Sequence, residues 1–254
     1  MSDSHALEPE MHEAEMHQAA HHEHPPYLRH HFNSMDQQND ATRFAMWLFL
    51  LTEVMFFGGM FVAYMIYRNW YYVSFVAASH QLSVPMGGIN SAILITSSFT
   101  MALGVWCAQM HRKAGLIFFL IITLVLGIVF LGIKAGEYKE KFEKHHYPGS
   151  HYSVQSFLNP ASDPVAVAAK DKPLPLDEAR RTELFFSLYF AMTGMHVLHM
   201  IVGMGILIFV IFQARLGAYT TGHTAFVEYF GMYWHFVDVI WIFLFPLLYL
   251  INRH

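Results

Sequence analysis

Five ionisable side chains stand out within the long apolar stretches of this sequence: Glu53, His196, His199, His235 and Asp238. Ionisable groups are costly in hydrocarbon, so each is expected to have a partner, to face a cavity or to serve a function. His196 and His199 are three residues apart, as are His235 and Asp238. This spacing places the two members of each pair on one face of a helix.

Three kinds of chemistry suit such a set. Imidazole nitrogens bind iron, copper and zinc, which would allow a haem or metal site. A carboxyl group and histidines at one depth of a membrane can also relay protons. The same groups can form a purely structural network that joins helices, and residue chemistry alone favours this third alternative. The inward histidines are too few to build a multi-metal redox centre.

The apolar stretches are long enough to be membrane-spanning helices. Of the 254 residues, 55% are hydrophobic and 13% are charged, fewer charges than soluble proteins carry. About 20 apolar residues in a helix cross a hydrocarbon core of about 30 Å, and the stretches lack the alternation of barrel strands. We therefore predict an all-α integral membrane protein, a bundle of five transmembrane helices near 44–67, 90–110, 114–135, 184–213 and 228–251.

A helical rise of about 1.5 Å per residue brings the ionisable groups to similar depths. Counted from the N-terminal side, Glu53 is ~13 Å deep, His235 ~10 Å and Asp238 ~15 Å, and His199 reaches ~21 Å from the other side. We expect the Glu53 carboxyl to hydrogen-bond to imidazoles of the fourth and fifth spans, with Glu53 and His235 joining the first span to the fifth.

Two segments outside the spans are polar. Residues 1–42 hold eight histidines among acids, amides and prolines, and their composition predicts a disordered tail; a Zn²⁺ or Cu²⁺ site is the alternative interpretation. Residues 136–182 mix acids, bases and prolines, and we expect a short helical extension followed by an irregular surface loop.

Composition also excludes several classes of protein. Cys107 is the single cysteine, so disulfides within the chain and thiolate metal cages are excluded. The formal net charge of −4 and the lack of a basic cluster argue against binding to nucleic acid.

Several segments resemble, in order, the helices of subunit III of the haem–copper oxidases. The resemblance covers all five spans and is carried by RFAMWLFLLTEVMFFGGMFVAY, INSAILITSSFTMAL, FLGIKAGEY, FFSLYFAMTGMHVLHMIVG and VEYFGMYWHFVDVIWIFLFPLLYL. The family often has seven spans. This chain is similar to its five-span form and starts where the third span of the long form would start.

The resemblance implies a non-catalytic subunit. Such a subunit binds no haem or copper, which lie on its partners, and it packs against the catalytic subunit I together with subunit II. A small subunit IV or a larger respiratory assembly are further partners that the family suggests. It also implies bound phospholipid and support of proton uptake in a bacterial plasma membrane, with the N-terminus cytoplasmic and the C-terminus periplasmic. A simple Lys/Arg count would give the opposite orientation.

The resemblance also implies roles for individual residues. Glu53 matches the family's buried carboxyl group, and His199 and His235 match histidines that recur in the same helices. Basic residues near the cytoplasmic interface can bind lipid phosphate, and tryptophan is common at this interface. The expected lipid contacts are therefore Arg43, Trp47 and Arg215. Two rival interpretations remain, the related accessory subunit of a nitric oxide reductase and an independent membrane proton relay or haem protein.

The composition of the tail leads to a first prediction. Deleting residues 1–31 should leave assembly intact, because the segment has too little apolar area to form a folded docking element. Native gels of membranes that carry the truncated chain should show a full-size oxidase complex. A complex lost on truncation would show that the tail is required for docking.

Overall fold

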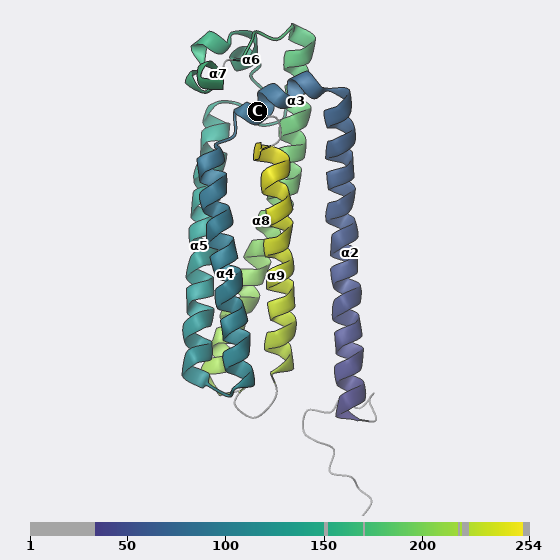
Figure 1. Cartoon of the computed structure of the whole chain (residues 1–254), viewed down its shortest axis with the longest axis vertical. Coiled ribbons are helices and arrows are strands. Elements are labelled where there is room, and N and C mark those ends of the chain that lie inside the picture. Colours follow the sequence, from purple (N-terminus) through teal and green to yellow (C-terminus); the bar gives the residue numbers. More distant parts are fainter. Residues whose placement is uncertain (1–33, 150–151, 170, 218, 220–223, 251–254) are drawn as a thin grey trace, which may run out of the picture. The chain divides into compact units, whose positions relative to one another are not determined.

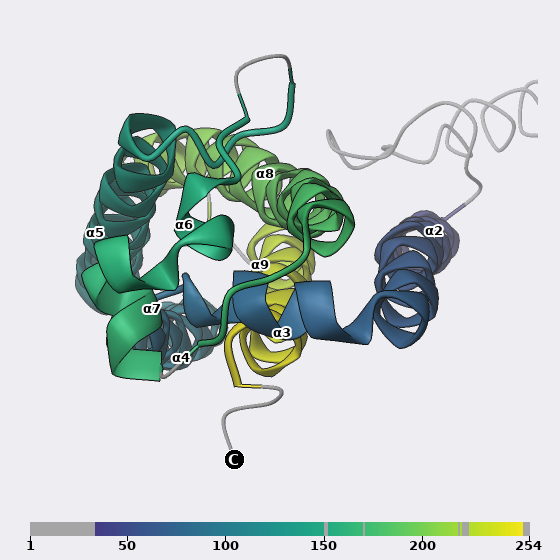
Figure 2. The ribbon, with the colours of Figure 1, turned by 90° about the horizontal axis from the view of Figure 1, so that it is seen from above.

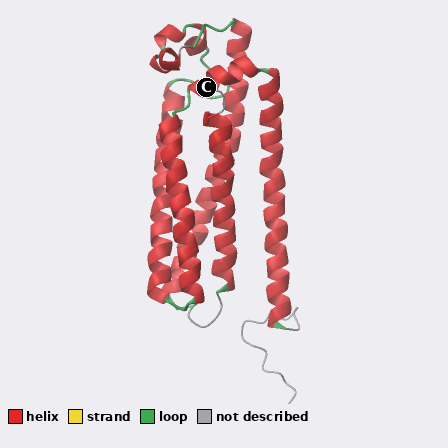
Figure 3. Ribbon diagram, viewed as in Figure 1, coloured by secondary structure: helices red, strands yellow, loops and turns green. Residues whose placement is uncertain are grey.

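The computed structural model describes residues 34–149, 152–169, 171–217, 219 and 224–250. The chain divides into two compact units, Met1–Met46 and Trp47–His254. All regular elements among the described residues are helices (Figure 3). The all-α prediction is therefore confirmed.

Within the described residues, five helices are long and apolar enough to cross a membrane, as predicted. Their bounds are α2 (Met35–Trp70), α4 (Val84–Gln109), α5 (Lys113–Glu143), α8 (Leu176–Arg215) and α9 (Ala225–Phe245), the last of which continues as the π-helix η2 (Pro246–Leu250).

Two of these helices extend well beyond the predicted apolar spans. α2 begins at Met35, where the hydroxyl of Ser34 accepts a hydrogen bond from the backbone N–H of Gln37 at 3.2 Å, so part of the segment expected to be disordered is helical. The rest of that segment, residues 1–33, lies outside the described residues. α5 continues to Glu143 because its polar end is rich in Lys and Glu, which are good helix formers.

Four short helices were not predicted: α3 (Tyr72–His80), α6 (Gln155–Leu158), η1 (Pro160–Ser162) and α7 (Pro164–Ala169). α3 packs against α8, where the Ser74 hydroxyl donates a hydrogen bond to the Glu178 carboxylate. The prediction of an irregular surface loop after the α5 extension was therefore wrong in part. The segment forms short helices and buries apolar side chains such as Phe157.

α4, α5, α8 and α9 form a four-helix bundle in which each helix contacts two neighbours (Figures 1 and 2). Small residues allow the close contacts: a Cβ atom at Gly203 would lie 3.2 Å from the Trp234 ring, and one at Gly127 would lie 3.4 Å from it. The Trp234 indole N–H donates to the Ser97 hydroxyl at 3.0 Å, so the wedged ring is also hydrogen-bonded. Small residues serve this purpose in membrane helix bundles because apolar lipid supplies no hydrophobic force between helices.

Residues 47–70 of α2 lie beside the bundle, near α8 and α9 (Figure 2). Tyr64 donates its hydroxyl hydrogen to the backbone carbonyl of Leu247 at 3.0 Å, and its ring contacts Phe185. Much of the helix still exposes bulky apolar side chains, including Trp47 and Met55. Such a surface suits lipid or another apolar protein surface rather than water.

His146, which follows α5, is buried in an aromatic pocket outside the spans. Its ring stacks on Phe186 with 5.2 Å between centroids and lies near Phe157, and its Nε2 atom is 2.9 Å from the Ser156 hydroxyl. Burial, aided by the nearby charge of Lys141, lowers the pKa of His146 from 6.5 to about 4.

The pKa of His146 predicts acid sensitivity of this region. Above pH 6.5 the imidazole is neutral in both states, but between pH 6.5 and 4 only the unfolded chain takes up the proton. Stability should therefore fall as the pH drops through this window, by at most about 3 kcal/mol. Hydrogen exchange of residues 152–169, corrected for intrinsic rates, should report this loss between pH 7 and 4.5.

His146→Phe provides the control for this prediction. The phenylalanine ring retains the aromatic contacts and cannot take up a proton. Its exchange should consequently change less with pH than that of the unsubstituted chain. Equal pH dependence in both proteins would show that His146 does not cause the acid sensitivity.

Candidate functional site: polar residues inside the helix bundle

Glu53 of α2 and His199 of α8 form a hydrogen-bonded pair. Oε2 of Glu53 lies 3.0 Å from Nε2 of His199, and both side chains are mostly buried. The His199 ring also packs against Phe57, with 5.2 Å between centroids. The hydroxyl of Tyr233 in α9 donates to the His199 carbonyl at 2.9 Å, so the pair lies where three helices meet.

The geometry of His199 fixes how many protons the pair holds. Its Nδ1 atom is 2.7 Å from the Met195 carbonyl oxygen, which can only accept, so Nδ1 carries a proton. The contact between Nε2 and the Glu53 carboxyl then needs a second proton, on either the imidazole or the carboxyl group. The pair therefore holds one proton that lies between a carboxyl group and an imidazole ring.

His196 does not belong to this pair, contrary to the expectation that it shares a face with His199. It is fully buried inside the bundle, with ring centroids 5.6 Å from Phe130 and 5.2 Å from Trp241. Neither ring nitrogen has a hydrogen-bond partner in the described part of the chain. Residues three apart are rotated by about 60° around a helix, which is enough to direct the two rings to different neighbours.

His235 pairs with α4 rather than with α2. Its Nδ1 atom is 2.6 Å from the Ser98 hydroxyl, and no hydrogen bond joins it to Glu53, although both residues are described. The predicted contact between Glu53 and His235 was therefore wrong, because α9 turns this ring toward the bundle. Asp238 is buried one turn further on, beside the same serine, and its carboxyl oxygens lack a hydrogen bond of good geometry to any described residue.

The most completely paired charges in the bundle were not predicted. Lys134 and Glu137 of α5 are each 1% exposed, and Nζ donates to Oε2 at 2.9 Å. Nζ also donates to the Tyr249 hydroxyl at 2.8 Å and lies 4.6 Å from the centre of the Trp241 ring. Tyr189 donates to Oε1 of Glu137 at 2.9 Å, and Tyr249 donates to the same oxygen. This Lys134–Glu137 cluster joins α5, α8 and η2.

A signal for this cluster was present in the sequence. Lys134 and Glu137 are three residues apart at the end of the apolar stretch, within the segment FLGIKAGEY. The predicted span ends at residue 135, so Glu137 falls in the predicted surface segment 136–182. Opposite charges at this spacing can pair on one helix, which allows the span to continue past them.

The residues expected to contact lipid are exposed. The Arg43 side chain is 63% exposed and lies 4.0 Å from Asp40, and Trp47 and Arg215 are exposed as well. Lipid contact at these positions stays a prediction. The described residues also contain no group of three or more His, Cys, Asp or Glu side chains that could hold a metal ion.

The fold and the site define a class of protein: a polytopic helical membrane protein with hydrogen-bonded ionisable pairs between its spans. Comparison with known proteins narrows the class. The family model for cytochrome c oxidase subunit III matches residues 181–252.

Curated relatives cover most of the chain. Cytochrome c oxidase subunit 3 of Synechocystis sp. is 32% identical over 217 residues, which are 84% of this chain and 76% of the relative. The protein of the same name from Thermostichus vulcanus is 30% identical, with 81% and 85% covered. A probable quinol oxidase subunit 3 of Staphylococcus saprophyticus is 22% identical, with 89% and 98% covered. The chain belongs to the cytochrome c oxidase subunit III family.

The Lys134–Glu137 cluster leads to a stability prediction. Lys134→Met should destabilise the folded protein by about 3–5 kcal/mol, because it leaves a buried carboxylate without its cation. The double variant Lys134→Met/Glu137→Gln should recover much of this loss, since the carboxamide oxygen still accepts from both tyrosines. Thermal unfolding in detergent measures both effects.

Lys139→Met is the matched control on the same helix. Lys139 is 78% exposed and lies 3.8 Å from Glu143, so its loss should cost less than about 1 kcal/mol. Equal destabilisation by the substitutions at Lys134 and Lys139 would contradict a structural role for the buried charge.

Proposed function

We propose that this chain is the non-catalytic subunit III of a haem–copper terminal oxidase in an aerobic electron transport chain. The observation that carries the proposal is the 32% identity to a cytochrome c oxidase subunit 3 over 84% of the chain. In this role the chain belongs to an enzyme complex that reduces oxygen to water with electrons from cytochrome c or a quinol. Haem and copper belong to its partners, subunits I and II.

The chain's own contribution is to hold lipid and a proton next to the catalytic subunit. The exposed apolar surface of α2 supports contact with phospholipid acyl chains or with subunit I. Arg43 and Arg215 are suited to lipid phosphate. We further propose a bacterial plasma membrane location, with the N-terminus cytoplasmic and the C-terminus periplasmic.

The Glu53–His199 pair supports a role in proton uptake. A carboxyl group and an imidazole that share one proton can pass it from one to the other at little structural cost, since the hydrogen bond persists in either arrangement of that proton. The pair also joins α2 to α8. Support of proton uptake and retention of the subunit therefore involve the same two side chains.

Two variants at Glu53 separate these roles. Glu53→Ala removes one partner of a mostly buried pair, which should cost about 1–3 kcal/mol and weaken retention of the subunit. Glu53→Gln can still donate to Nε2 of His199, so the subunit should stay bound, but the titratable proton is lost. Both variants should lower the initial rate of oxygen reduction less than they shorten the enzyme's life over many turnovers, because the chemistry takes place on another chain.

Initial oxygen consumption, inactivation over many turnovers and subunit stoichiometry should be measured on each preparation. Thr52→Ala is the control, since the Thr52 side chain is exposed and its hydroxyl donates to the Phe49 carbonyl of its own helix. Immediate loss of turnover with normal stoichiometry in Glu53→Gln would mean that every catalytic cycle passes through this carboxyl group, and the supporting role would be rejected.

A further inference from the structure

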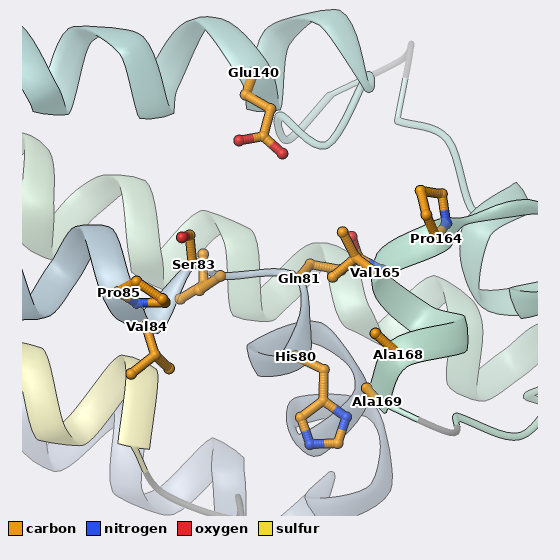
Figure 4. Close-up of a pocket in the computed structure, with 11 residues that line it drawn as sticks. His80, Gln81, Ser83, Val84, Pro85, Glu140, Pro164, Val165, Ala168 and Ala169 are labelled. Atoms are coloured by element: carbon orange, nitrogen blue, oxygen red, sulfur yellow. The ribbon is translucent and has the colours of Figure 1, made fainter.

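A pocket of about 410 Å³ lies at the end of the bundle where the α3–α4 turn, α5 and α7 meet. Figure 4 shows Glu140 of α5 directed into this space from one side, opposite Val165 and Pro164. His80 and Ala168 line another part of the wall. The pocket lies apart from the polar residues described above, and the site proposed for it contains none of them.

One buried acceptor in the lining of the pocket lacks a donor. Gln81 is 3% exposed, and its side-chain oxygen Oε1 has no hydrogen-bond partner among the described residues. Oε1 of Glu140 lies 3.0 Å from Nζ of Lys144 and 4.0 Å from Nζ of Lys141. The Ser83 hydroxyl adds a further acceptor to the lining. A buried acceptor without a donor is costly, so the pocket favours a ligand rich in donors.

One polar lining residue, His80, is already engaged and shapes the wall instead. Nδ1 of His80 lies 2.6 Å from Oδ1 of Asp171, which ties the end of α3 to the chain that follows α7. The remaining lining is aliphatic and is contributed by Leu82, Val84, Pro85, Pro164, Val165, Ala168 and Ala169. The lining thus combines an apolar wall with a carboxylate and neutral acceptors.

We infer that this pocket binds a primary ammonium group at the end of an aliphatic stem, the chemistry of a lysine side chain from a partner subunit. An ammonium group has three donors and no acceptor, which matches Glu140, Gln81 and Ser83. The aliphatic wall suits the methylene stem. A guanidinium group brings five donors in a plane and would leave several of them unsatisfied.

Lys144 competes for the same carboxylate. The Glu140 and Lys144 side chains are 40% and 31% exposed, and an ion pair so close to the surface contributes little to stability. An entering ammonium group therefore replaces Lys144 at small cost. It follows that removing Lys144 strengthens binding, whereas removing the charge of Glu140 abolishes most of it.

The first experiment uses the purified full-length chain in an uncharged detergent. Ligand-detected NMR should show binding of N-acetyl-lysine methylamide and little binding of N-acetyl-norleucine methylamide, which has a similar stem without the ammonium group. Glu140→Gln should weaken binding about tenfold or more, because one charged hydrogen bond is lost. Lys144→Met should tighten it. Equal binding of the two ligands, or no effect of Glu140→Gln, would overturn the inference.

Two variants, Ala168→Leu and Val167→Leu, test whether the ligand binds in this pocket. Ala168→Leu fills the pocket from an exposed position and should block binding. Val167→Leu enlarges the neighbouring, 56% exposed side chain, which is not part of the lining, and should leave binding unchanged. If both variants bind as the unsubstituted chain does, the ligand sits elsewhere and the inference fails.

The second experiment identifies the source of the ammonium group, and this part alone rests on the proposed function. A carbodiimide added to native membranes should join the Glu140 carboxyl to a lysine of another subunit through an amide bond, detected by mass spectrometry. Glu140→Gln should lose this product, and Glu143→Gln, at an exposed position one turn away, should retain it. A diamine recovered from the pocket would support a free amine as ligand, and a product with Lys144 alone would overturn the partner lysine.

Discussion

A lysine and a glutamate can share the interior of a membrane protein only if both are fully paired, and this constraint organises the end of the bundle. Lys134 and Glu137 satisfy one another and draw Tyr189 and Tyr249 to the same point. Removing any member would leave a buried charge with too few partners. The tyrosines belong to α8 and η2, so the charge pair fixes where these elements meet α5.

α2 is held differently, and the difference bears on function. Its described contacts with the rest of the bundle include two hydrogen bonds, Glu53 to His199 and Tyr64 to the Leu247 carbonyl, and aromatic packing around Phe57. Much of its remaining surface is apolar and exposed. In the role proposed above, such a helix can offer most of its surface to lipid or to a partner while two polar contacts set its depth.

The polar residues show which features of the site could be predicted from the sequence. Depth along each span was predictable, since helical rise is constant, and Glu53 and His199 do lie at one level. Their side-chain directions were not predictable, so the expected pairing of Glu53 with His235 was wrong. The pairing of Lys134 with Glu137 was missed because hydropathy alone ended the predicted span at residue 135, between the two residues.

The sequence by itself determined the helical class, the five spans and the family, because these follow from the length, the apolarity and the order of segments along the chain. Only the tertiary structure decided which polar groups meet. A pairing depends on the rotation of each helix about its axis, and that rotation is set by packing, as where Gly203 and Gly127 admit the Trp234 ring. The pocket beside Glu140 could not be predicted from the sequence either, because its walls come from α3, α5 and α7, which are separate segments of the chain.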